Sequence, residues 1–110
     1  MSATDHLVLR TVYIDADAEG RLRSEATATR GSKAALFRRY VTAGRRHARS
    51  RPEVLRAVSD MAQGAPLVLQ TVRLDAKLDH RLVVEAVDSG ASWNDLLRRY
   101  LRIGLDAVAI

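Results

Sequence analysis

The chain has 110 residues, of which 47% are hydrophobic and 28% charged, a balance that is ordinary for a globular domain and excludes a disordered tail. It contains no cysteine, which excludes disulfides, thiol nucleophiles and thiolate metal sites. No apolar run approaches the length of a membrane span, and the polar start "MSATDH" lacks the pattern of a signal peptide. We therefore expect a cytoplasmic protein with no membrane partner.

The net charge of +5 is unevenly distributed along the chain. Residues 1–60 hold 12 Lys and Arg against 7 Asp and Glu, whereas residues 61–110 hold 6 against 6. A basic balance of this kind favours a polyanionic partner such as nucleic acid, although many basic proteins bind nothing charged.

The first predicted element is a strand at residues 7–15, "LVLRTVYID", in which polar and apolar residues alternate from Thr11 to Ile14. Asp15 is a good N-cap, and a helix is predicted after it because apolar residues then recur at helical spacing. This helix should stop near Arg30-Gly31. Ser32 is predicted to cap a second helix. The predicted core positions are Ala18, Leu22 and Ala26 in the first helix, and Leu36, Phe37, Tyr40 and Val41 in the second.

A linker helix is predicted between this unit and the rest of the chain. Ser50 would start it, Pro52 would lie in its first turn, and Gly64-Ala65-Pro66 would end it. Its predicted inward residues are Val54, Leu55, Val58 and Met61.

The second half repeats the first. Residues 7–48 align with residues 67–108 without a gap, and 17 of the 42 pairs are identical. The repeated strand, "LVLQTVRLD", differs from the first at three positions: Arg10/Gln70, Tyr13/Arg73 and Ile14/Leu74. The matching helices carry Leu78, Leu82 and Ala86, then Leu96, Leu97, Tyr100 and Leu101, with a turn at Ser89-Gly90 and a cap at Ser92. We expect a first repeat at 1–48, a helical linker at 49–66 and a second repeat at 67–110, sharing one core.

Each repeat has only one strand, and unpaired backbone groups on a strand are costly when they are buried. The simplest partner for each strand is the other copy, aligned antiparallel. The predicted fold is therefore mostly α with a short two-stranded antiparallel β-ribbon. One face of the ribbon would be buried and the other free: Val12, Ile14, Val72 and Leu74 would point inward, and Thr11, Tyr13, Thr71 and Arg73 outward.

With "TVRLD", an amphipathic helix, "SGAS" and "LLRRYL" in this order, the chain resembles the ribbon-helix-helix (Arc/MetJ-type) family of bacterial DNA-binding proteins. Both repeats match, as in the single-chain tandem form of TraY-type proteins, so the resemblance implies an intramolecular pseudo-dimer. It also implies a ribbon that lies in the DNA major groove and reads base edges. The implied base readers are Thr11, Tyr13, Thr71 and Arg73. Phosphate would bind at the start of each second helix, at Gly31, Ser32, Lys33 and Ala91, Ser92, Trp93.

Three features depart from the family pattern. Leu9 and Leu69 occupy outward positions where a polar reader is common. Arg10 and Gln70 occupy inward positions but would reach DNA if the ribbon ends twist, so they are kept as base readers. Trp93 replaces the usual basic residue, and its indole N–H would contact the backbone or its ring would pack.

Several cationic and apolar groups allow more than one interpretation. The run Arg45, Arg46, Arg49, Arg51 and Arg56 is either a solvated helix end or a phosphate contact. For Arg38, Arg39, Arg98 and Arg99, bridges to acidic neighbours such as Glu25 and Glu85 are favoured over DNA contact. Leu101, Leu105 and Val108 of the last helix would pack within the chain or against another molecule, and the first is preferred.

The leading hypothesis is a nucleoid-associated regulator or repressor of transcription that binds double-stranded DNA, with cooperative self-association on adjacent sites. His6, His47 and His80 lack metal-ligand spacing, and no nucleophile motif is found, so we expect no enzyme activity, no cofactor and no small-molecule ligand. One alternative is a relaxosome accessory protein of conjugation, which the tandem layout favours. Another is an antitoxin or scaffold, although antitoxins of this family usually extend beyond the second helix, whereas this sequence ends at Ile110.

Overall fold

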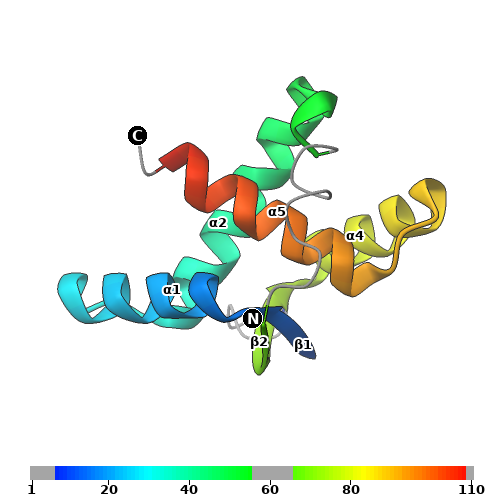
Figure 1. Cartoon of the computed structure of the whole chain (residues 1–110). Helices are drawn as coiled ribbons and strands as arrows, with labels where there is room; N and C mark the ends of the chain where they lie inside the picture. The colour runs from blue at the N-terminus through cyan, green and yellow to red at the C-terminus, as the bar shows by residue number, and fades with distance from the viewer. Residues whose placement is uncertain (1–6, 56–65, 109–110) are drawn as a thin grey trace.

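The computed structural model describes residues 7–55 and 66–108. The elements are β1 (Leu7–Asp15), α1 (Ala16–Thr29), α2 (Lys33–Ser50), β2 (Leu67–Asp75), α4 (Ala76–Ser89) and α5 (Trp93–Val108). The predicted class is confirmed, since the chain is mostly helical with one two-stranded antiparallel sheet. In Figure 1, α2 and α5 cross above the ribbon, and α1 and α4 lie on either side. None of the helices within the described ranges is long and apolar enough to cross a membrane.

The two copies of the repeated stretch pair with each other. Thr11 lies opposite Thr71, so each position of one strand faces its partner symmetrically about this central pair. The predicted faces are confirmed, because Val12, Ile14, Val72 and Leu74 are at most 5% exposed, while Thr11, Tyr13, Thr71 and Arg73 are exposed. The hydrophobic effect therefore fixes the register, since a slip of one residue would expose this inner face.

The predicted caps of the second helices are confirmed. The Ser32 hydroxyl accepts a hydrogen bond from the Ala35 amide at 3.2 Å, and the Ser92 hydroxyl accepts one from the Asp95 amide at 3.0 Å. The first helices end where predicted, α4 at the left-handed Gly90 (φ 72°) and α1 at Arg30 (φ 55°). The sequence pattern predicted that the turn after α1 uses the backbone freedom of Gly31. The residue with left-handed dihedral angles is instead Arg30, which matches Gly90 in the other repeat.

The predicted start of the linker helix at Ser50 is wrong. Helix α2 runs through Ser50, whose hydroxyl donates to the His47 carbonyl oxygen at 3.0 Å, and a new helical turn begins at Pro52. Val54 and Leu55 pack against the core as predicted. The predictions for Val58, Met61 and Arg56 fall outside the described residues.

The core lies where α2 and α5 cross each other. All predicted core residues of these two helices are buried, and Leu105 is buried too, which confirms packing within the chain for this residue and for Leu101. Nothing is described of the Val108 side chain. At the crossing, a Cβ on Gly104 would lie closer than 3.0 Å to the Tyr40 carbonyl oxygen, and one on Gly44 equally close to that of Tyr100. The two backbones therefore touch directly, and only glycine fits at either position.

We expect Gly104→Ala to lower the free energy of unfolding by about 3 kcal/mol, because the added methyl group must push two backbones apart. Gly20→Ala is the control. Gly20 lies inside α1, and a Cβ added there would have no neighbour within 4 Å, so this substitution should stabilise the protein by about 0.5 to 1 kcal/mol. Urea unfolding measures both changes, and a Gly104→Ala variant as stable as the parent would contradict the close crossing.

Candidate nucleic-acid interface

The outer face of the ribbon presents three cross-strand pairs in a row. Leu9 lies opposite Arg73, Thr11 opposite Thr71, and Tyr13 opposite Leu69. All six side chains are exposed, with exposed fractions of 64% for Leu9, 52% for Tyr13 and 56% for Leu69. The face is therefore chemically directional: a guanidinium marks one end, a phenol marks the other, and two threonines form a symmetric centre.

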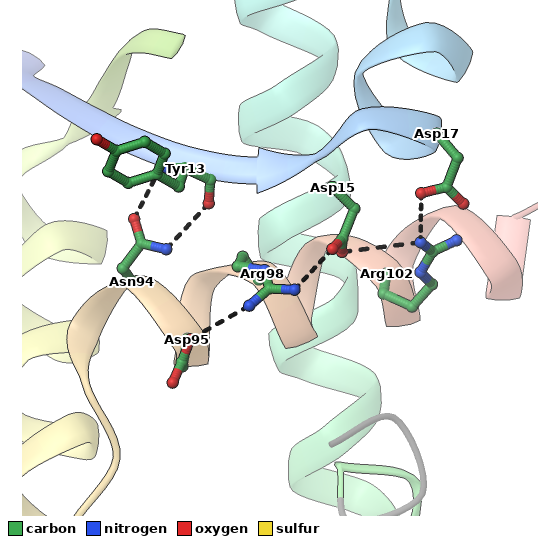
Figure 2. A network of polar contacts seen from close by, with 7 residues as sticks. All are labelled: Tyr13, Asp15, Asp17, Asn94, Asp95, Arg98 and Arg102. Atoms are coloured by element: carbon green, nitrogen blue, oxygen red, sulfur yellow. Dashed lines mark hydrogen bonds and ion pairs between the residues drawn. The ribbon is translucent and has the colours of Figure 1, made fainter. Parts of the chain in front are cut away.

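Tyr13 is held in place by a residue that sequence reasoning missed. The side-chain amide of Asn94 on α5 accepts from the Tyr13 backbone N–H at 2.8 Å and donates to the Tyr13 carbonyl oxygen at 2.9 Å (Figure 2). Ala34 occupies the matching position of the first repeat and cannot do this. There, Arg38 donates to the Arg73 carbonyl oxygen at 3.4 Å. The signal that could have indicated Asn94 is its polar side chain just after a cap, where the other copy has alanine.

The starts of α2 and α5 lie beside the two strands of the ribbon. Lys33 and Ala34 line a small cavity together with Gln70 and Thr71 of β2, while Asn94 attaches the start of α5 to β1. Two amides among the predicted phosphate ligands already have partners: that of Gly31 donates to the Ala26 carbonyl, and that of Ala91 to the Ser89 hydroxyl.

The matching positions Glu19 and Asp79 of the two repeats are both buried carboxylates, and they pair with different cations. Asp79, 6% exposed, receives hydrogen bonds from Arg10 at 2.7 and 3.0 Å, and this contact raises the pKa of Arg10. Glu19, 8% exposed, is paired with Arg23 and with Lys33 at 3.2 Å. The hydrogen bond from Arg23, with a further one from Lys33, holds the pKa of Glu19 below its ordinary value.

This pairing explains two differences between the repeats at once. Where the strand supplies the cation Arg10, the helix start carries Trp93, and the Arg10 guanidinium lies 5.6 Å from the centre of the indole ring. Where the helix start supplies Lys33, the strand carries neutral Gln70. A buried carboxylate needs compensating charge nearby: Arg10 supplies it to Asp79, and Arg23 and Lys33 together supply it to Glu19.

Trp93 packs and does not present its side-chain donor. Its ring lies against the core, and its Nε1 atom is buried without a partner among the described residues. Of the two interpretations given for Trp93, the structure therefore supports packing, and the indole N–H is not offered to a phosphate.

Arg98 and Arg102 join α5 to the end of β1 through an ionic network (Figure 2). Arg98 contacts the buried Asp15 at 2.7 Å and Asp95 at 3.3 Å, and Arg102 contacts Asp15 at 3.7 Å and Asp17 at 2.8 Å. Bridging to acidic neighbours was the favoured prediction for Arg98, but the acids differ from those expected.

Glu25 and Glu85 bind other residues. Glu25 accepts a hydrogen bond from the Tyr40 hydroxyl, and Glu85 accepts one from Tyr100 and pairs with Arg45 at 2.6 Å. Burial, together with the Glu85 carboxylate, raises the pKa of Tyr100 to about 12. Arg45 is therefore accounted for by an internal ion pair and is not simply a solvated member of the basic run.

Comparison with known proteins gave no match: no family model, curated protein or solved structure is similar to this chain. The resemblance to the ribbon-helix-helix family therefore stays a prediction from the sequence motifs.

We expect Asn94→Ala to expose the Tyr13 backbone to solvent while leaving the fold intact. Loss of two hydrogen bonds at about 0.5 to 1.5 kcal/mol each should speed exchange of the Tyr13 amide by about tenfold or more. Hydrogen exchange followed by NMR measures this, with the Val12 amide as internal reference. Unchanged Tyr13 exchange would show that Asn94 does not hold the strand.

Arg98→Ala should destabilise the protein by about 3 kcal/mol, because it leaves the buried Asp15 carboxylate with only the longer contact to Arg102. The repeat supplies a matched control, since Arg38→Ala removes one long hydrogen bond to a carbonyl and should cost below about 1 kcal/mol. Equal losses in urea unfolding would contradict the structural role assigned to the Asp15 network.

Proposed function

We propose that this chain is a sequence-specific double-stranded DNA-binding protein of the ribbon-helix-helix type, in which the two repeats form an intramolecular pseudo-dimer. The ribbon enters the major groove, and the protein acts as a bacterial regulator or repressor of transcription. The single observation that carries the proposal is the exposed outer face of β1 and β2, where Thr11, Tyr13, Thr71 and Arg73 stand free on a ribbon whose other face is buried.

The dimensions and chemistry of this face suit the major groove. A groove about 12 Å wide admits a two-stranded ribbon, and base edges there offer donors, acceptors and thymine methyl groups. Arg73 is suited to a bidentate contact with guanine, and the two threonines to either an adenine or a thymine. Leu9 and Leu69, which break the polar pattern, are suited to apolar contact with thymine methyl groups.

The positions of α2 and α5 add support. Both helices begin beside the ribbon and are capped by Ser32 and Ser92, so their positive ends lie near the strands. Helix starts on both sides of a ribbon are suited to the two phosphate backbones that border a major groove. Lys33 at one start is paired with Glu19, and Trp93 at the other carries no charge, so phosphate contact is expected to depend on the positive helix ends more than on a side-chain cation.

The order of the readers predicts an asymmetric target. Because the strands run antiparallel, the face reads Arg73 with Leu9, then the threonine pair, then Tyr13 with Leu69. Because the two ends of the face carry different side chains, they should contact different bases. We expect a guanine opposite Arg73, and a base that offers an apolar surface or a mixed polar and apolar one opposite Tyr13 and Leu69. We assign Arg10 primarily to Asp79, so it is a weaker candidate for base contact than Arg73.

One observation favours a second candidate function. Leu9, Tyr13, Leu67 and Leu69 are exposed hydrophobic residues on or beside the outer face of the ribbon. An apolar strip of this kind also suits a protein interface, as in an antitoxin or scaffold. This candidate would be supported if the protein binds no DNA at any salt concentration but forms a stable complex with another protein.

Arg73→Ala should relax the preference at one base position of the target and weaken binding by about 1 to 3 kcal/mol. The measurement is selection from a randomised duplex pool, followed by titration against the selected site and its single-base variants. Arg49→Ala is the control, because Arg49 is exposed near the end of α2, far along the helix from the ribbon. A uniform loss across all sequences would instead identify Arg73 as a phosphate contact.

Selection of bound fragments from the source genome distinguishes the two DNA-binding roles. Sites at promoters would support the regulator, and a site beside a relaxase gene would support the conjugation accessory role.

A further inference from the structure

A basic groove lies between α2 and the start of α4, next to the end of β2. Helix α2, the end of β2 and the start of α4 line this groove. Its residues are Arg38, Arg39, Thr42, Ala43, Arg45 and Arg46 of α2, Asp75 of β2, and Lys77, Leu78 and Arg81 of α4. Six of these ten residues are cationic and one is acidic. Arg45 pairs with Glu85, but Arg39, Arg46, Lys77 and Arg81 form no ion pair with any residue in the described ranges.

The matching positions of the other repeat have a different charge. Lys77 corresponds to Asp17, Arg46 to Asp106, and Arg45 to Leu105. The carboxylates there are paired: Asp17 with Arg102 at 2.8 Å and Asp106 with Arg21 at 3.1 Å, while Asp15 is held by Arg98 (Figure 2). Both repeats therefore have a groove at this place, but the charges of one are paired internally, whereas the other carries an excess of cations without ion-pair partners in the described residues.

The stability of the fold does not explain this difference in charge between the two grooves. The acidic version is satisfied internally, so replacing two carboxylates by two cations removes stabilising pairs and brings like charges together. Uncompensated cations in a groove are expected where an anion from outside supplies the missing charge.

The groove begins at the ribbon and leads away from it. Arg38 touches the Arg73 carbonyl at the end of β2, and Lys77 follows two residues after the strand. Arg46 lies eight residues beyond Arg38 on α2, or about 12 Å along the helix. With one phosphate for about 3.4 Å of axis on each DNA strand, this length spans about three phosphates.

We propose that the groove between α2 and α4 binds the phosphodiester backbone of duplex DNA that flanks the ribbon contact on one side only. This inference rests on the proposed function and adds a direction to it. When the cations of the groove neutralise phosphates on one side of the site, the duplex is drawn toward α2 and bends on that side. The complex then has one fixed orientation on the DNA. The counterpart, whose charges are paired internally, leaves the other flank uncontacted.

The test uses a double variant, Arg46→Asp with Lys77→Asp, which gives these two positions the carboxylates of the counterpart. The control is Arg49→Asp with Arg51→Asp, which changes the net charge equally at exposed positions that do not line the groove. Thermal melting of both variants near the parent value confirms that they fold. The probe is a duplex selected from a randomised pool, prepared at the length of the ribbon site and with about ten added base pairs, one helical turn, on either side.

The extended duplex should bind the parent more tightly than the short one, and hydroxyl-radical protection should extend on one side. Between about 50 and 200 mM salt the parent should lose about tenfold more affinity than the groove variant, because two phosphate contacts are missing in the variant. The control variant should behave as the parent, with the one-sided protection retained.

Failure of the inference is distinguishable from failure of the proposed function. If the parent binds the selected duplex but the groove variant keeps the same salt dependence and protection, the groove inference is overturned and the ribbon function stands. If the variant loses binding to a polyglutamate peptide while DNA binding is unchanged, the groove belongs to an acidic protein partner. Absence of any duplex binding by the parent overturns both.

Discussion

The close crossing of α2 and α5 is the constraint on which the other contacts depend. Gly44 and Gly104 let each helix touch the other's backbone, at the carbonyl groups of Tyr100 and Tyr40. No side chain separates the helices at this point, so their angle and register are defined by backbone contact. Both helices begin beside the ribbon, and the crossing therefore fixes where their starts lie relative to the two strands.

Elements governed by local chemistry were predictable from the sequence. The alternation in both copies indicated the strands and their buried faces, and Ser32 and Ser92 indicated the second helices, because capping depends on residues only three positions apart. The end of α2 was not predictable in this way. Ser50 looks like a cap, but its hydroxyl bonds back to the helix that precedes it.

Contacts between elements were the part that sequence reasoning could not supply. A glycine inside a helix usually indicates weak helical propensity, although Gly44 and Gly104 are identical in both repeats and this identity was an available signal. The sequence pattern did not indicate that Asp79 and Glu19 are buried, and only the fold places Arg10 and Lys33 against them. Pairing of buried charges depends on residues far apart in the chain, so periodicity does not indicate it.

The hold of Asn94 on Tyr13 also affects how the protein behaves in a crowded solution. A ribbon of two strands has two open sides, and each open side is a template on which another extended chain can add as a further strand. Asn94 occupies both backbone groups of Tyr13, and Arg38 occupies the carbonyl of Arg73 on the other strand. Two side chains thus block strand addition at opposite sides, which guards a small exposed sheet against intermolecular β-aggregation.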